Sequence, residues 1–121
     1  MYMDKDTLSK RYIKFIQRVT DNEEVYILMG ENGAALSTSL HFEDEDGNAS
    51  PLICFWSKKS QAQAHIREEW QDYKLFTISL DDLRDKWLPG MHYDQVYGGL
   101  EFDQNFFGIE KDPLDLLRDL E

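Results

Sequence analysis

The chain has 121 residues, a length that predicts a single domain over residues 1–121 with a core large enough to fold without disulfides or structural metal. Hydrophobic residues make up 41% of the chain, and its three Trp, six Tyr and seven Phe exclude a disordered or low-complexity segment. The 24 acidic and 13 basic residues give a formal net charge of −11, which disfavours nucleic acids and anionic membranes as partners because both require Lys and Arg to neutralise phosphates.

The first predicted element is an amphipathic helix that begins at Asp4 or Asp6 and ends near Val19. Its apolar residues recur at three- and four-residue intervals, which places them on one helical face: Leu8, Tyr12, Phe15, Ile16 and Val19. Lys14 and Arg18 lie near the end of this segment, where positive charge complements the helix dipole. We therefore expect a helix that packs one face on the rest of the domain.

Three strands are predicted after this helix. Residues 24–29 and 34–38 form a β-hairpin, because the Asn32-Gly33 pair between them favours a tight turn with positive φ. Residues 51–56 form a continuous apolar run, which is typical of a strand covered on both faces. We expect this third strand at the centre of the sheet.

The next predicted element is a second helix, over residues 58–70. Ser57 stands where a helix-capping residue belongs. The apolar residues that share one face of this helix are Ala62, Ile66 and Trp70. Residues 75–79 alternate in a way that predicts another strand directly after it.

A third helix is predicted over residues 80–87, with Leu80, Leu83 and Trp87 at helical spacing. Pro89-Gly90 is expected to end it. Trp87 is interpreted as a core aromatic residue. Residues 96–102 and 105–109 then predict two further strands.

The last predicted element is a short helix opened by Asp112-Pro113, with proline at the favoured first position. The whole order indicates an α+β fold in a single domain, with one mixed, mostly antiparallel sheet. A central strand-helix-strand-helix-strand segment implies that part of the sheet is parallel, and the N-terminal and C-terminal helices are expected to pack on the sheet.

Several of these segments carry a resemblance to a known family: Tyr12-x-x-Phe15-Ile16, Glu24-Val25-Tyr26, Pro51 to Trp56, Glu69-Trp70-x-x-Tyr73, Ile78-x-Leu80 and Lys86 to Met91. Together they resemble the small bacterial family catalogued as domain of unknown function 2750, and Trp87-Leu88-Pro89-Gly90 is the most specific element. The order of strand, helix, strand and Asp-Leu-rich helix is also similar to the N-terminal domain of SseB-like proteins. Neither resemblance implies a catalytic residue, a substrate or a cofactor.

Catalytic and metal-binding motifs are weakly supported by the residues themselves. Cys54 lies inside an apolar run, a setting that hides a thiol and disfavours the nucleophilic thiolate. His65 and Glu69, one helical turn apart, are a possible metal pair, but nothing in the spacing identifies further ligands, and a half-buried structural histidine explains the same residues. We expect no cofactor and no metal, and catalysis is not the favoured interpretation.

A ligand site is predicted where the strand 51–56 ends and the second helix begins. Free backbone N–H groups and two lysines at this point favour an anion, although an ordinary serine cap with solvated lysines explains the same sequence. Exposed aromatic residues are expected nearby, with residues 90–94 bordering the same region. The predicted binding residues are Trp56, Ser57, Lys58, Lys59, Trp70, His92 and Tyr93.

The favoured function is a non-enzymatic protein-interaction or binding module that docks a partner through these aromatics or through its acidic loop, Glu43 to Asp46. Such a loop favours a basic protein as the partner. The alternative is a small-molecule or anion binder, or an unrecognised hydrolase, with its site near Ser57 to Ser60. A chain without an apolar leader or membrane span is expected in the bacterial cytoplasm, and its oligomeric state is left open.

Overall fold

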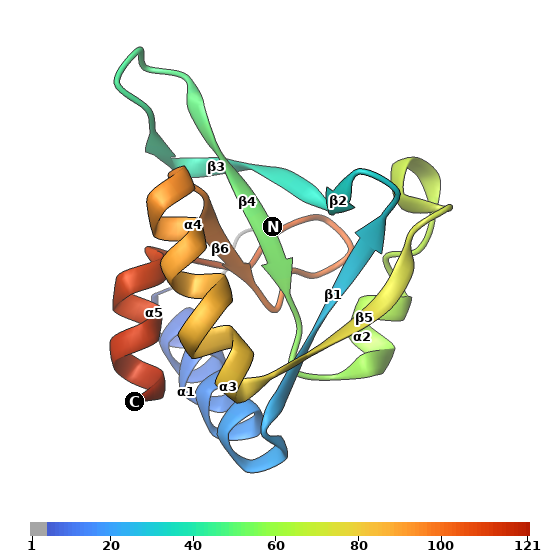
Figure 1. The fold of residues 1–121 in the computed structure, drawn as a ribbon, viewed down its shortest axis with the longest axis vertical. Coiled ribbons are helices and arrows are strands. Elements are labelled where there is room, and N and C mark those ends of the chain that lie inside the picture. Colours follow the sequence, from blue (N-terminus) through green and yellow to red (C-terminus); the bar gives the residue numbers. More distant parts are fainter. Residues whose placement is uncertain (1–4) are drawn as a thin grey trace.

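The structure is a computed structural model that describes residues 5–121, and its chain begins with helix α1, Lys5–Asn22 (Figure 1). The predicted N-terminal helix is confirmed, and it buries Phe15 and Val19 completely. Figure 1 shows α1 beside α4 (Leu88–Asp94) and α5 (Pro113–Leu120), to one side of the strands. Burying the apolar face of α1 against these elements stabilises the helix more than residue propensity does.

The first sheet is antiparallel and has the order β2-β1-β5. Its strands are β1, Glu24–Gly30, β2, Gly33–Ala34, and β5, Lys74–Ser79. The predicted turn is confirmed in the β1–β2 pair, with Gly33 at φ 122°, but the second hairpin strand predicted over residues 34–38 is wrong, because residues 36–38 pair with β4 in the second sheet. Only two residue pairs join β1 to β2, Met29 with Ala34 and Gly30 with Gly33, because the chain then crosses into the second sheet.

The second sheet has the order β3-β4-β6-β7. Its strands are β3, Leu36–Glu43, β4, Ala49–Phe55, β6, Tyr97–Leu100, and β7, Ile109–Lys111. β4 and β6 are parallel, whereas β3 and β7 pair antiparallel at the two edges. The predicted central strand is therefore confirmed, since β4 has a neighbour on each side.

The α+β class is confirmed, whereas the expectation of one sheet is wrong. Within residues 5–121 one isolated antiparallel bridge joins the two sheets, in which Tyr26 and Trp56 exchange two N–H···O bonds of 2.9 Å. β5 does not lie parallel to β4 after a helical crossover, because it pairs along its whole length with β1. Two parallel strands need a long crossover connection between them, usually a helix. The segment between β4 and β5 contains only the short α2 and a 3-10 turn.

Two hydrophobic clusters cover opposite faces of the strands. Alternate residues of β1 and β4 belong to different clusters: Val25, Ile27, Ile53 and Phe55 to the larger one, and Tyr26, Leu28, Leu52 and Cys54 to the smaller. The larger cluster also contains the buried residues of α1, α4 and α5, so the terminal helices pack on the sheets as predicted. Burial on both faces explains why the run at residues 51–56 has no polar alternation.

The prediction of one helix over residues 58–70 is wrong. The structure has a short α2, Lys59–Gln63, then turns and a 3-10 turn, Glu68–Trp70. His65 lies between them, and its ring nitrogens contact two backbone oxygens, of Gln61 at 2.9 Å and of Asp103 at 3.0 Å. The buried His65 ring makes these two contacts from the segment between α2 and the 3-10 turn, where the backbone is no longer a regular helix.

The helix predicted to stop at Pro89-Gly90 continues through both residues. It runs as α3, Leu80–Asp82, a π-helical turn, Leu83–Trp87, and α4, ending at Gln95 in the left-handed conformation with φ 59°. Proline lacks an N–H and its ring clashes with the carbonyl four residues earlier in an α-helix. The wider π turn before Pro89 relaxes this conflict, which is why the proline does not end the helix.

Two further expectations about the C-terminal half are corrected. The strand predicted over residues 105–109 is wrong, because residues 101–108 form a loop in which Asp103 Oδ1 accepts bonds from the N–H groups of Asn105 and Phe107. Trp87 is half-buried at the edge of the larger cluster, so it is not a core aromatic residue. The last helix, α5, is confirmed, and Asp112 caps it by accepting from the N–H of Leu114 at 2.8 Å.

Strand β3 breaks its pairing with β4 between Thr38 and Glu43. Glu110, on the opposite edge strand β7, reaches this break, where its carboxylate accepts bonds from the Ser39 hydroxyl and from the Leu40 N–H at 2.8 Å. The two edge strands of the second sheet are therefore linked through one side chain.

Candidate functional site

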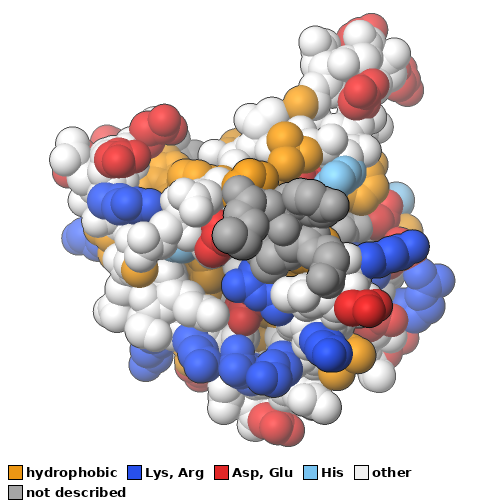
Figure 2. All heavy atoms as spheres, turned by 180° about the vertical axis from the view of Figure 1, so that it is seen from behind, with side chains coloured by type: hydrophobic (Ala, Val, Ile, Leu, Met, Phe, Trp, Pro, Cys, Tyr) orange, Lys and Arg blue, Asp and Glu red, His pale blue; other side chains and the backbone are white. Residues whose placement is uncertain are grey.

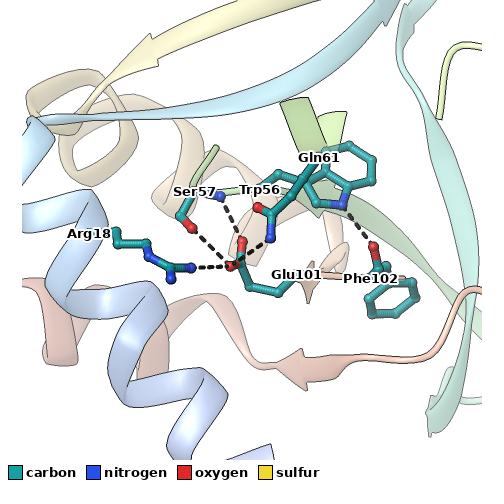
Figure 3. Close-up of polar contacts among 6 residues, drawn as sticks. All are labelled: Arg18, Trp56, Ser57, Gln61, Glu101 and Phe102. Carbon is teal, nitrogen blue, oxygen red and sulfur yellow. Dashed lines mark hydrogen bonds and ion pairs between the residues drawn. The ribbon is translucent and has the colours of Figure 1, made fainter. Parts of the chain in front are cut away.

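The carboxyl ends of the parallel strands β4 and β6 bring Ser57 and Glu101 together (Figure 3). The Glu101 carboxylate accepts bonds from the Ser57 N–H at 2.7 Å and the Ser57 hydroxyl at 2.8 Å. Gln61 Nε2 lies 3.5 Å away, and the guanidinium of Arg18 on α1 also lies 3.5 Å from the carboxylate. Glu101 is only 6% exposed. Its buried carboxylate contacts residues of α1, of α2 and of the segment after β4.

Glu101 occupies the place where sequence reasoning expected an external anion. The N–H and hydroxyl of Ser57 both point at this carboxylate, and Ser57 does not cap α2, whose N-cap residue is Lys58. Lys58 and Lys59 are exposed to solvent, and Lys59 Nζ lies 5.9 Å from the centre of the Tyr26 ring. Glu101 was not selected from the sequence, because the predicted strand over residues 96–102 includes it, whereas β6 ends at Leu100.

Trp56 and Trp70 are not exposed, which corrects the expectation that they form an aromatic surface. Trp56 has no exposed area, and its Nε1 donates to the Phe102 carbonyl at 3.0 Å. Trp70 is also buried, with its ring centre 5.4 Å from that of Phe106. These two aromatics belong to the interior of the smaller cluster.

His65 stacks against Trp56 at a centroid distance of 4.7 Å and is buried. Both of its ring nitrogens lie within hydrogen-bond distance of backbone carbonyl oxygens, so neither is available to bind a metal. Glu69 is exposed on the 3-10 turn. It does not follow His65 on the same α-helix, as the predicted metal pair required. In the part of the chain that the structure describes, no three His, Cys, Asp or Glu side chains gather as metal ligands.

Cys54 is buried in β4, and burial, with a smaller effect of the Glu110 charge, raises the pKa of its thiol to about 12. An unfolded chain releases this proton about three pH units earlier, so the thiol stabilises the folded state below pH 9 and loses that contribution as pH rises toward 12. We expect wild type to lose about 1–2 kcal/mol more stability than Cys54→Ala between pH 8 and 10, measured by urea unfolding. Equal losses in both proteins would contradict this assignment.

His92 and Tyr93 lie on α4, which leads into the amino end of β6, whereas Ser57 lies beyond the carboxyl end of the parallel strand β4. The expectation that residues 90–94 border Ser57 is therefore wrong. Instead, His92 and Tyr93 line a groove of about 470 Å³ between the tip of the β3–β4 hairpin, α4 and the start of α5. We call this the acidic groove.

The acidic groove has an apolar floor and a negative rim. Met91, Val96 and Tyr97 contribute to the floor, and the Tyr97 ring stacks on Phe42 at a centroid distance of 4.0 Å. Four carboxylates line the rim, from Glu43, Asp44, Glu45 and Asp112. Among the described residues that line this groove, none is Lys or Arg.

The hairpin tip projects from the body of the molecule, and its carboxylates gather at the end of the projection (Figures 1 and 2). Asp44 Oδ1 accepts from the N–H groups of Asp46 and Asn48, both at 2.9 Å, and Gly47 supplies a positive φ of 80°. These contacts hold the acidic loop in a defined turn. Tyr93 stands beside it on α4 with 87% of its side chain exposed.

A family model described as a protein of unknown function, DUF2750, matches residues 12–120. The chain belongs to the DUF2750 family. That description names no activity for the DUF2750 family. No curated protein and no solved structure matches the chain, and the likeness to SseB-like domains finds no support. None of the helices within residues 5–121 has the length and hydrophobicity needed to span a bilayer.

Proposed function

We propose that this domain is a protein-interaction module that binds a basic segment of a partner protein in the acidic groove. The observation that carries the proposal is a groove rimmed by four carboxylates and lined, among described residues, by no basic side chain. A partner rich in Lys or Arg gains ion pairs there, and the ring of Tyr93 offers a face for a cation. A formal net charge of −11 also favours rapid association with such a partner.

The shape of the groove favours an extended segment over a compact metabolite. Its lining comes from the β3–β4 hairpin, α4 and the start of α5, and its acidic residues lie on the hairpin and at the N-cap of α5. Exposed tyrosine is enriched in protein interfaces because its ring contributes contact area with little loss of side-chain entropy. The unpaired and buried Cys54 agrees with the reducing cytoplasm, which we include in the proposal.

The alternative of an anion-binding or hydrolytic site near Ser57 to Ser60 has weaker support. The donors that suggested it, the N–H and hydroxyl of Ser57, are already bonded to Glu101. What remains is a pair of exposed lysines, which solvation explains.

Charge reversal in the groove tests the proposed function. We expect Glu43→Lys/Glu45→Lys to weaken binding of a labelled lysine-serine peptide at least about tenfold at low salt, because two of the four rim carboxylates become cations. Fluorescence anisotropy measures the affinity, and raising the ionic strength to about 0.5 M should weaken wild-type binding.

The matched control is Glu31→Lys/Glu69→Lys, which makes the same change in net charge at exposed positions outside the groove. We expect this variant to lose only a small part of the affinity. The proposal fails if both double variants lose affinity equally, or if wild type does not bind the peptide at low salt.

A further inference from the structure

Gly90 lies inside helix α4, where neither backbone conformation nor packing requires glycine. Gly90 is part of a regular helical segment and does not have a positive φ. A Cβ atom added at Gly90 would meet no atom within 4 Å. Glycine in a helix is less stable than alanine, so this position lowers helix stability without an internal benefit.

The space beside Gly90 is an apolar hollow of about 260 Å³. Ile53, Trp87, Met91 and Val96 line it together with Gly90, and Lys86 and Asp94 lie at its margin. A cavity of about 150 Å³ with apolar walls already holds a benzene molecule. The hollow therefore has room for a branched or aromatic side chain of a partner. A large side chain at position 90 would occupy the same space.

The hollow is continuous with the acidic groove. Met91 and Val96 line both, so the hollow lies directly beside the groove and one bound segment is long enough to contact both. The two regions differ in character, because the groove is rimmed by carboxylates whereas most of the hollow is apolar. A single bound segment thus meets negative charge at one end and apolar contact at the other.

We infer that the hollow at Gly90 receives an apolar anchor residue of the basic partner segment, so that the partner is amphipathic as well as cationic. This inference rests on the proposed function and specifies its ligand. The groove supplies charge complementarity and orientation, and burial of the anchor against Trp87 and Met91 supplies affinity and selectivity. The absence of a side chain at Gly90 leaves the anchor its space.

The test compares two peptides of equal charge, one of lysine and serine and one of lysine and leucine, on wild type and Gly90→Leu. Wild type is expected to bind the lysine-leucine peptide at least about tenfold more tightly. Gly90→Leu is expected to abolish this preference, because its side chain takes the space of the anchor and lowers the affinity for the lysine-leucine peptide at least about tenfold. Its melting temperature is expected to equal or exceed that of wild type, since leucine favours the helix.

The outcomes separate the inference from the proposed function. Equal affinity of wild type for both peptides, or an unchanged preference in Gly90→Leu, overturns the anchor while binding in the groove stands. Failure of both peptides to bind overturns both. Gly90→Ala provides a smaller filling of the same space if Gly90→Leu folds poorly, and it is expected to reduce the preference in part.

Discussion

Glu101→Ala is expected to lower the free energy of unfolding by about 4 kcal/mol, because it leaves buried groups without their partner. The N–H and hydroxyl of Ser57 both donate to the Glu101 carboxylate, and neither has access to water, since Ser57 is buried. Arg18 loses its ion pair at the same time. Chemical denaturation by urea, followed by far-UV circular dichroism, measures the effect.

Glu101→Gly is the matched variant for this experiment, because Glu101 has a φ of 56° that glycine adopts more easily than alanine. We expect Glu101→Gly to be destabilised by about 1 kcal/mol less than Glu101→Ala, yet still well below wild type. A Glu101→Gly protein as stable as wild type would show that backbone conformation, and not the carboxylate, governs this position. Glu45→Ala, at an exposed loop position, serves as the control with little expected change.

Trp56→Ala is expected to cost about 4–5 kcal/mol, the upper range for removing a fully buried aromatic side chain. Trp56 has no exposed area, stacks on His65 and donates to the Phe102 carbonyl, so its loss opens a cavity and leaves an unpaired buried acceptor. The backbone of Trp56 also forms the only described bridge between the two sheets, with Tyr26. Equilibrium unfolding in urea measures the change.

Trp87→Ala is the matched comparison, because it removes the same side chain from a half-buried position. We expect a cost of about 1–2 kcal/mol, since much of the Trp87 ring is already in water and its ring centre lies 6.2 Å from that of Phe76. Trp56→Phe covers the case in which Trp56→Ala does not fold, and its expected cost is about 2–3 kcal/mol. Equal destabilisation by Trp56→Ala and Trp87→Ala would contradict the difference in burial on which both predictions depend.

Elements with a regular pattern and a local start or stop were predictable from the sequence. The α1 helix has an apolar face, the β1–β2 turn has Asn32-Gly33, and α5 has Asp112-Pro113, and each lies where predicted. β4 was also predictable, because a run buried on both faces has no polar alternation. In all of these cases the local pattern and the burial of the element in the fold favour the same conformation.

Most of the failures arise from contact with residues distant in the sequence, and one arises from an irregular helical turn. The helix after β4 stops early where His65 contacts the backbone oxygen of Asp103, which is 38 residues away. The helix through Pro89 continues because of a π turn that no local rule signals. Trp56 and Trp70 were assigned to the surface since aromatic residues near a strand end occur in ligand sites, whereas their burial depends on Phe102 and Phe106.

The candidate site was only partly predictable for the same reason. The acidic loop and the pair His92 and Tyr93 were chosen from the sequence, but nothing in the sequence places them in one groove. That arrangement follows from the parallel pairing of β4 and β6, which brings the end of α4 next to the hairpin. The opposite end of the same strand pair holds Glu101, which sequence analysis did not select.

The link that Glu110 makes across the second sheet has a consequence for aggregation. An edge strand with unpaired N–H groups is a template on which another chain adds a strand and begins an intermolecular sheet. The irregular part of β3 would present such donors at Ser39 to Phe42, but the Glu110 carboxylate takes the Leu40 N–H and the Ser39 hydroxyl takes the Phe42 N–H at 2.7 Å. The irregular part of β3 is therefore protected against this kind of misassembly, even though Leu40 is 71% exposed to solvent.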